Sequence, residues 1–396
     1  MRDFKYVVIG AGMTAHAAVK GIREVDTAGA IAVIGDEPDP PYNRPPLTKS
    51  LWKGKAVDSI WCNIQALGAE LCLERRAVRV STASREVTDD RGEVYTYAKL
   101  LLATGASPRR LPYGGRDILY YRTLQDYRRL RELADRGNEF LVIGGGFIGS
   151  EIAAALAMNG KHVSMVLPEA AVGARMFPAD LALYLNRYYE TKGVDVLCGL
   201  KVSNIARKNG GYLVKVEDGR TLVVDAVVAG IGVQPNAALA ADAGIETEDG
   251  IPVDDGLETS QPDIYAAGDV ALFYSPLLDR RLRVEHEDNA KTMGTAAGRC
   301  MAGEKTPYRH LPYFYSDLFD LGYEAIGETD PHYETITLWK EPYRKGTIFY
   351  LKRGRVRGIV LWNVWKCVDA GRQLLGEPGP FDETRLKEWV ASLPDA

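Results

Sequence analysis

One short pattern occurs twice in this chain, and it constrains the fold more than any other feature. An apolar run that ends in glycines and opens into a helical pattern starts at Tyr6 (YVVIGAGMTA) and again at Phe140 (FLVIGGGFIGSE). The loops read GxGxxA, from Gly10 and Gly12, and GxGxxG, from Gly144 and Gly146. In such loops the first glycine makes the tight turn, the second lets a diphosphate approach the backbone, and the third small residue packs helix on strand. Each loop therefore predicts a dinucleotide site at a helix N-terminus.

An acidic residue follows each loop at the distance expected for a contact with an adenosine ribose. Asp36 lies 21 residues after Ala15, and Glu169 lies 20 residues after Gly149. A carboxylate at this place accepts hydrogen bonds from ribose hydroxyls and repels a 2′-phosphate, so Glu169 favours NADH. Arg175, six residues further on, would soften that preference.

Two such sites mean either a duplication with one inactive copy or two different dinucleotides. The second alternative has a chemical rationale, because a flavin in one domain can accept hydride from a nicotinamide in the other. The small-residue turns ATG (103–105) and AAGD (266–269) favour it, since both follow apolar strands where a backbone must pass close to a ligand. Asp269 in the second turn can hydrogen-bond a ribityl or phosphate group.

Composition and length exclude several classes of protein. A chain of 396 residues predicts two or three domains. The net charge of −4 gives no sign of a general affinity for nucleic acid or anionic membranes. No apolar run reaches the roughly 18 residues of a membrane span. Because the first strand begins by Tyr6, we expect no targeting peptide and a cytoplasmic protein.

The cysteines predict neither a disulfide framework nor a metal site. None of the five has CxxC spacing, and no clustered histidine motif occurs. A disulfide reductase is disfavoured for the same reason. The cysteines are Cys62, Cys72, Cys198, Cys300 and Cys367.

The expected fold is α/β, with two Rossmann-like domains and a C-terminal α+β domain. β-α-β units are predicted from residue 6 to 34 and from 140 to 167, and a meander of strands from 194 to 231. The five prolines in 37–49 predict a loop without helix. Further expected elements are helices at 124–136, 289–302 and 382–392 and strands at 333–340, 346–352 and 355–362, the last two forming a hairpin.

Five motifs in this order, GAGMTA, ATGASP, GGGFIGSE, GIGVQPN and AAGDV, resemble the flavoprotein reductases of the ferredoxin reductase and glutathione reductase type. Four more, PYNRPPLTKSLW, VEHEDNA, YFYSDLFDLGYEAIG and KGTIFYLKRGRVRGIVLWN, resemble the apoptosis-inducing factor family, whose members bind FAD and react with NADH. The long acidic insertion of that family's C-terminal domain is missing between Asp330 and Lys345. The resemblance implies an FAD domain (1–115 and 235–308), an NAD(H) domain (116–234) and a C-terminal domain (309–396).

The resemblance also implies the residues of both cofactor sites. Gly10, Gly12, Met13 and Thr14 would cradle the FAD diphosphate, with Asp36 on its ribose. The remaining FAD positions are Arg44, Lys49, Val78 through its backbone, Arg122, Asp269, Glu285, His286, and Tyr315 in place of a tryptophan. On the nicotinamide side the matching positions are Gly146, Phe147, Ile148, Glu151, Glu169, Gly232, Glu324 and Asn363, with Arg175 where the family has a lysine.

We expect catalytic roles for four of these residues. Lys49 and Glu151 form a candidate ion pair, in which the cation stabilises the reduced flavin and the carboxylate holds and tempers it. Phe147, at the helix start, would cover one face of the nicotinamide. His286 would hydrogen-bond the flavin or cap the following helix.

Two functions remain open from the sequence. The first is an NADH oxidoreductase that passes electrons from FAD to ferredoxin, rubredoxin, a quinone or dioxygen. The second is a slow, NADH-sensing flavoprotein whose stable reduced-flavin–NAD charge-transfer complex changes its partners. A homodimer is an expectation from the family alone.

Overall fold

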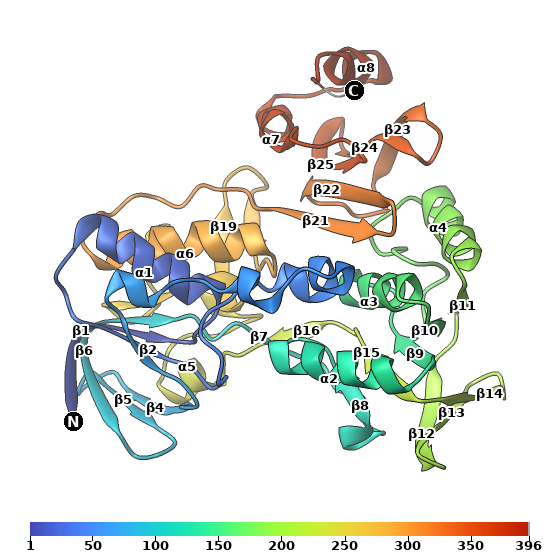
Figure 1. Ribbon diagram of the computed structural model, residues 1–396. Helices are drawn as coiled ribbons and strands as arrows, with labels where there is room; N and C mark the ends of the chain where they lie inside the picture. Colours follow the sequence, from blue (N-terminus) through green and yellow to red (C-terminus); the bar gives the residue numbers. More distant parts are fainter. Residues whose placement is uncertain (395–396) are drawn as a thin grey trace. The chain divides into compact units, whose positions relative to one another are not determined.

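The computed structural model of the chain describes residues 1–394, which fall into two compact units. Unit 1 comprises Met1–Pro45, Ala56–Ser107 and Gln234–Pro312, and unit 2 comprises Pro46–Lys55, Pro108–Val233 and the described residues from Tyr313 on. The α/β class is confirmed: unit 1 has one parallel sheet at its core, and unit 2 combines a parallel sheet with an antiparallel one (Figure 1). The three predicted domains and their boundaries stay a prediction.

The core of unit 1 is a sheet in which β1 (Arg2–Ile9) pairs in parallel with β2 (Ile31–Ile34) and β6 (Val94–Leu102). The parallel strands β3 (Glu70–Cys72) and β18 (Ile264–Ala266) extend it, and β5 (Glu86–Asp89) and β4 (Ala77–Ser81) add an antiparallel hairpin. Strand β2 is buried along its whole length, and β1 and β6 are buried over residues 6–9 and 100–102, as parallel strands covered by helices require. Smaller elements of this unit are β17 (Ile251–Pro252), β19 (Ala271–Ser275), β20 (Arg280–Leu282) and α5 (Ala238–Asp242).

Two helices of unit 1, α1 (Met13–Val25) and α6 (Glu287–Met301), lie side by side (Figure 1). Glycines let their backbones approach closely. A Cβ at Gly21 would lie 2.2 Å from the Thr295 carbonyl oxygen, and one at Gly298 would lie 2.1 Å from that of Ala18. This packing fixes α1, and with it the first glycine loop, against α6.

Unit 2 begins with a five-stranded parallel sheet in the order β11-β10-β9-β15-β8. Its strands are β8 (Ile118–Tyr120), β9 (Glu139–Ile143), β10 (His162–Leu167), β11 (Val194–Cys198) and β15 (Ala226–Ala229). Helices α2 (Leu124–Arg136), α3 (Phe147–Met158) and α4 (Ala179–Thr191) pack against it. The expected meander is right only for β12 (Val202–Lys208), β13 (Gly211–Val216) and β14 (Thr221–Val224), because β11 and β15 join the parallel sheet.

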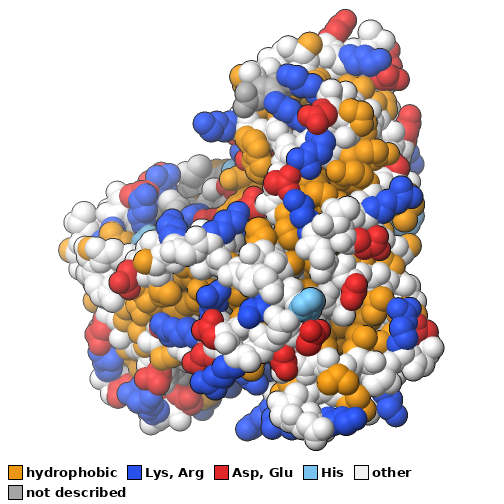
Figure 2. All heavy atoms as spheres, turned by 45° about the vertical axis from the view of Figure 1, so that its right-hand side comes forward, with side chains coloured by type: hydrophobic (Ala, Val, Ile, Leu, Met, Phe, Trp, Pro, Cys, Tyr) orange, Lys and Arg blue, Asp and Glu red, His pale blue; other side chains and the backbone are white. Residues whose placement is uncertain are grey.

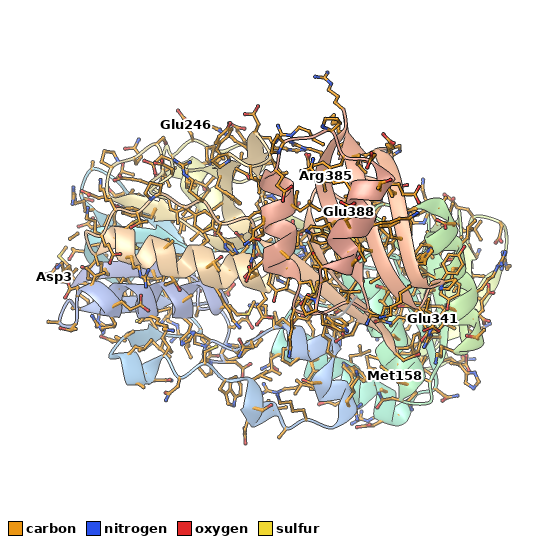
Figure 3. The ribbon with its side chains drawn as sticks, turned by 90° about the horizontal axis from the view of Figure 1, so that it is seen from above. Asp3, Met158, Glu246, Glu341, Arg385 and Glu388 are labelled. Carbon is orange, nitrogen blue, oxygen red and sulfur yellow. The ribbon has the colours of Figure 1, made fainter. Side chains whose placement is uncertain are left out.

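The C-terminal part of unit 2 is an antiparallel sheet in the order β21-β22-β25-β24-β23. Its strands are β21 (Tyr313–Leu318), β22 (Leu321–Gly327), β23 (Glu334–Glu341), β24 (Lys345–Lys352) and β25 (Arg355–Trp362). Helix α7 (Val368–Gly376) packs on β22 and β25, and α8 (Glu383–Ala391) follows. Arg385 of α8, labelled in Figure 3, reaches Glu377 at 2.7 Å and lies over the Phe381 ring.

The segment Pro46–Lys55, here named the strap, belongs to unit 2 although the chain on both sides of it belongs to unit 1. The expectation that residues 37–49 hold no helix is wrong at their end, because Pro45–Thr48 forms a 3-10 turn; a second 3-10 turn, Ser50–Lys53, follows this stretch. A proline fits a first helical turn, where its fixed φ is helical and its missing N–H is not needed.

On the face drawn in Figure 2, basic and acidic side chains are interspersed, so this face offers no broad area of a single charge sign. Within residues 1–394, no helix is long and apolar enough to cross a membrane.

Candidate functional site

The first glycine loop has the shape of a diphosphate cradle. Gly10, at φ +110°, is packed so tightly that a Cβ would lie 2.1 Å from the Ala103 carbonyl oxygen. At Gly12 a Cβ would meet no atom within 4 Å. Gly12 is the N-cap of α1, and within the described chain no side chain caps this helix and its first turn has no acidic residue. The N–H groups at the helix start are thus available to an anion.

The second loop, in unit 2, repeats this geometry. Gly144 has φ +102°, and a Cβ there would lie 2.5 Å from the Gly230 carbonyl oxygen. A Cβ at Gly149 would lie 2.0 Å from the Gly144 carbonyl oxygen, whereas Gly146, the N-cap of α3, again faces open space. Packed first and third positions with an open second position fit a dinucleotide at each loop.

The two acidic residues lie just beyond the strands that follow each loop. Asp36 comes after β2, is 62% exposed, and lies 3.6 Å from Arg76. Glu169 comes after β10, is 21% exposed, and lies 2.5 Å from the guanidinium of Arg175, which is 83% exposed. Arg175 is therefore a direct partner of Glu169.

In unit 1, Thr14 meets the turn that carries Asp269. Thr14 is buried in the first turn of α1, and a Cβ at Gly268, next to the buried Asp269, would lie 2.3 Å from its hydroxyl oxygen. Arg283 donates to the Glu285 carboxylate at 2.5 Å and to the Asp269 carbonyl oxygen at 3.4 Å, so it ties two predicted FAD residues together.

The other predicted FAD positions of unit 1 lie on several segments of the chain. Arg44 lies 2.5 Å from Glu37 and donates to the Tyr42 hydroxyl at 3.0 Å. Met13 opens α1, and Val78 lies on β4 with an exposed side chain. His286 holds the N-cap position of α6, where its side chain makes no capping hydrogen bond.

A buried carboxylate is the centre of the site residues in unit 2. Glu151, on α3, is only 4% exposed, and its Oε1 accepts from the Lys49 ammonium. Two hydroxyl groups complete its partners: Ser316 donates to Oε1 at 2.6 Å, and Thr48 donates to Oε2 at 2.5 Å. Burying a carboxylate is costly unless several donors satisfy it.

Sequence reasoning missed Thr48 and Ser316. Both lie next to residues that it did select, Lys49 and Tyr315. The signal available was the apolar helix around Glu151, since a buried carboxylate needs more donors than one lysine supplies. Hydroxyl residues are too common in sequences for that need to single out these two.

Aromatic side chains lie beside Lys49 and at the start of α3. The Lys49 ammonium lies 5.3 Å from the centre of the Tyr315 ring, and the Phe147 ring contacts Phe314 edge-on at 5.3 Å. Burial, and then the charge of Glu151, raise the pKa values of the Tyr189 and Tyr323 hydroxyls well above their usual range, so both stay neutral. Phe147 and Ile148 are each 37% exposed, which leaves the start of α3 accessible.

Four predicted positions make hydrogen bonds to partners other than Glu151, and these bonds serve local structure. Gly232, at φ +88°, accepts from the Arg109 N–H at 2.9 Å. The backbone N–H of Arg122 donates to Asp126 at 3.1 Å, at the start of α2. The Asn363 side chain bridges the Gly322 N–H and the Arg344 carbonyl oxygen, each at 2.8 Å. Glu324, opposite Tyr315 across β21 and β22, accepts from the Lys366 N–H at 3.1 Å.

The pKa values of the cysteine thiols favour electron transfer without a protein thiol. Burial raises the pKa values of the Glu324 carboxyl and of three cysteine thiols. These are Cys62, Cys198 and Cys300. A thiol with a raised pKa is a poor nucleophile, and the five cysteines are all free. Over the described range 1–394, no group of three or more His, Cys, Asp or Glu residues could hold a metal ion.

Comparison with known proteins identifies the family. Residues 4–294 match the family described as pyridine nucleotide-disulphide oxidoreductase, and residues 297–342 and 340–377 match the apoptosis-inducing factor, mitochondrion-associated, C-terminal family. The chain is 32% identical to "Apoptosis-inducing factor 1, mitochondrial" of Dictyostelium discoideum, over 95% of this chain and 79% of that protein. It is 34% identical to "Monodehydroascorbate reductase 3" of Arabidopsis thaliana, over 91% of this chain and 89% of that protein.

A solved structure covers almost the whole length. The ferredoxin reductase for the CYP199A2 system from Rhodopseudomonas palustris superposes with a TM-score of 0.89 and 32% identity, over 97% of this chain and 99% of that one. The resemblance found in the sequence motifs is thus confirmed, and so are FAD and NAD(H) as the cofactors. This chain belongs to the pyridine nucleotide-disulphide oxidoreductase family, as an FAD-dependent NAD(P)H oxidoreductase with the C-terminal domain type of apoptosis-inducing factor.

Proposed function

We propose that this protein oxidises NADH and delivers the electrons, through FAD, to a small iron–sulfur protein of the ferredoxin type. FAD held by this chain would supply the hydride acceptor for NADH and the source of electrons for the acceptor protein. The observation that carries the proposal is the pair of open second glycines, Gly12 in unit 1 and Gly146 in unit 2, each at the start of a helix without a side-chain cap in the described chain.

The residues divide between two tasks in this proposal. The loop with Gly12, together with Thr14, Asp36 and Asp269, holds the FAD. The loop with Gly146 and the carboxylate of Glu169 hold NADH, with Phe147 at the nicotinamide. Lys49, held by Glu151, supplies the positive charge that favours the reduced flavin. A cytoplasmic location and a homodimer stay predictions of the sequence.

An external electron acceptor fits the cysteines. Disulfide reductases of this family type need a redox pair near the flavin, whereas all five cysteines here are free and the thiols of Cys62 and Cys300 have raised pKa values. The likeness to a ferredoxin reductase over nearly both whole chains favours a ferredoxin-type protein over rubredoxin, quinone or dioxygen.

The preference for NADH is testable at Glu169. In Glu169→Gln the carboxylate that opposes a 2′-phosphate is gone while Arg175 remains, so the ratio of kcat/KM for NADH to that for NADPH should fall by about 10- to 100-fold. Arg175→Gln should raise the same ratio. Glu190→Gln, at an exposed position on α4, is the matched control and should change neither constant. An unchanged ratio in Glu169→Gln would show that this carboxylate does not contact the ribose.

The acceptor is tested with the purified, FAD-loaded protein. NADH is mixed with it anaerobically, and reduction of cytochrome c is then followed with and without a [2Fe–2S] ferredoxin as carrier. We expect rapid bleaching of the flavin and cytochrome reduction that depends on the ferredoxin. Equal rates without the carrier would refute a ferredoxin-type acceptor.

The match of residues 297–342 and 340–377 to the C-terminal family of apoptosis-inducing factor favours a second function. In that case the protein senses NADH, turns over slowly, and acts through changed binding of partners. A long-wavelength absorbance band that lasts for minutes in air, with slow ferredoxin reduction, would support this function over the reductase.

A further inference from the structure

The Glu151 carboxylate joins three segments of unit 2 that are far apart in sequence. Its partners Thr48 and Lys49 come from the strap, Ser316 comes from β21, and Glu151 itself lies on α3. All four side chains are nearly buried, at 6% exposure for Thr48, 12% for Lys49, 4% for Glu151 and 0% for Ser316. We call these residues the Glu151 cluster.

The two carboxylate oxygens are not equivalent. Oε1 accepts from both the Lys49 ammonium and the Ser316 hydroxyl, whereas Oε2 accepts from the Thr48 hydroxyl. Hydrogen bonds to a carboxylate are charge-assisted and draw negative charge toward the donor. Ser316 therefore competes with Lys49 for the charge of the same oxygen, and Thr48 draws charge to the other.

The strap itself is fixed by unit 2. The Leu47 carbonyl oxygen accepts from the Tyr121 hydroxyl at 2.5 Å and from the Trp52 indole N–H at 2.9 Å. The Asn159 side chain donates to the Trp52 carbonyl oxygen at 3.2 Å. Because these anchors flank Thr48 and Lys49, the backbone is fixed, and the side-chain partners of Lys49 decide where its charge lies.

We infer that Ser316 and Thr48 are positioning residues that set, through Glu151, how strongly Lys49 acts on the flavin. The inference rests on the proposed function, because it takes Lys49 as the cation at the flavin ring. When both hydroxyl groups donate to the carboxylate, they draw part of its negative charge toward themselves, so Glu151 neutralises less of the Lys49 charge. When one of the two hydroxyl groups is removed, the carboxylate binds Lys49 more strongly. It then also opposes added negative charge on the flavin more strongly.

This predicts a shift in the reduction equilibrium. In Ser316→Ala, the ratio of reduced to oxidised flavin at a fixed solution potential should fall by about threefold to tenfold, which is about 14–30 mV for a two-electron couple. Thr48→Val should shift the ratio in the same direction. Ser316→Thr and Thr48→Ser keep the hydroxyl groups and should restore the wild-type ratio.

A control variant separates this effect from a loss of stability. Thr347, on β24 of the same sheet, is 1% exposed, and within the described part of the chain its hydroxyl has no hydrogen-bond partner. Thr347→Val removes a buried hydroxyl outside the Glu151 cluster and should leave the flavin ratio unchanged. The ratio is measured by spectroelectrochemical titration of the FAD-loaded protein, and thermal unfolding of each variant is recorded beside it.

The possible results separate the two proposals. If wild-type protein binds no FAD, or NADH does not bleach it, the proposed function fails. If wild-type protein behaves as proposed but Ser316→Ala and Thr48→Val titrate like wild type or like Thr347→Val, the positioning role alone is overturned. A shift to a higher proportion of reduced flavin would also overturn it, because the sign would be opposite.

Discussion

Gly12→Ala should give a folded protein that purifies without FAD, whereas Gly146→Ala should keep its yellow colour and bind NADH at least about 100-fold more weakly. Both residues have extended backbone angles that alanine tolerates, at φ −96° and −82°. A Cβ at either position meets nothing within 4 Å, so the fold itself is not disturbed. The methyl group would instead occupy the space through which a diphosphate approaches the backbone.

The measurements are the FAD content of the purified protein, the NADH dissociation constant, and thermal unfolding of the flavin-free chain. Gly149→Ala is the contrasting variant, since its Cβ would lie 2.0 Å from the Gly144 carbonyl oxygen and the backbone must shift. It should lower stability, which the other two variants should not. If Gly12→Ala loses NADH binding and Gly146→Ala loses FAD, the assignment of the two loops must be exchanged.

These loops also show why part of the fold was predictable. Strand, glycine turn and helix follow each other within a few residues, so local sequence determines α1 and α3, which begin directly after Gly12 and Gly146. Helix α6 likewise begins at residue 287 rather than the expected 289. The C-terminal hairpin was predictable for the same reason, because Arg353 and Gly354 make the turn between β24 and β25.

Other elements depend on tertiary contacts and were not predicted as such. Helix α4 follows Pro178 with several tyrosines and polar residues, and its buried residues become apparent only when it packs on β11. Strands β21 and β22 are short and separated by two residues, and α7 is stabilised where Gly371 packs against Ile326. No short window of sequence contains these partners.

The same distinction applies to the site. The glycines and the acids that follow them could be selected because their spacing is fixed by one β-α-β unit. Ser316 and Thr48 could not, since they are separated from Glu151 by 165 and 103 residues and only the fold brings them to it. The strap shows this most clearly: its sequence position predicts an FAD-domain loop, whereas its hydrogen bonds go to residues of unit 2.

The second large effect is expected from substitutions of Glu151 and Lys49. Glu151→Leu leaves the Lys49 charge and two hydroxyl groups without their partner in the interior, so the free energy of unfolding should fall by about 3–5 kcal/mol. Glu151→Gln keeps an acceptor for Lys49 and Ser316 and should cost only about 1–2 kcal/mol. The values are measured by urea unfolding of the flavin-free protein, with Glu132→Gln on the exposed side of α2 as control.

The double variant Lys49→Met/Glu151→Leu separates stability from electron transfer. Replacing a buried ion pair by apolar side chains is often nearly neutral, so removal of the Lys49 charge should restore part of the stability that Glu151→Leu lost. The remaining deficit, about 1–3 kcal/mol for the two hydroxyl groups together, reflects Thr48 and Ser316, which still lack an acceptor. Flavin reduction by NADH, followed by stopped flow, should stay slow in the double variant because the cation is gone. Recovery of both stability and reduction rate would mean that the pair only fills space, and that the charge of Lys49 has no part in the reaction.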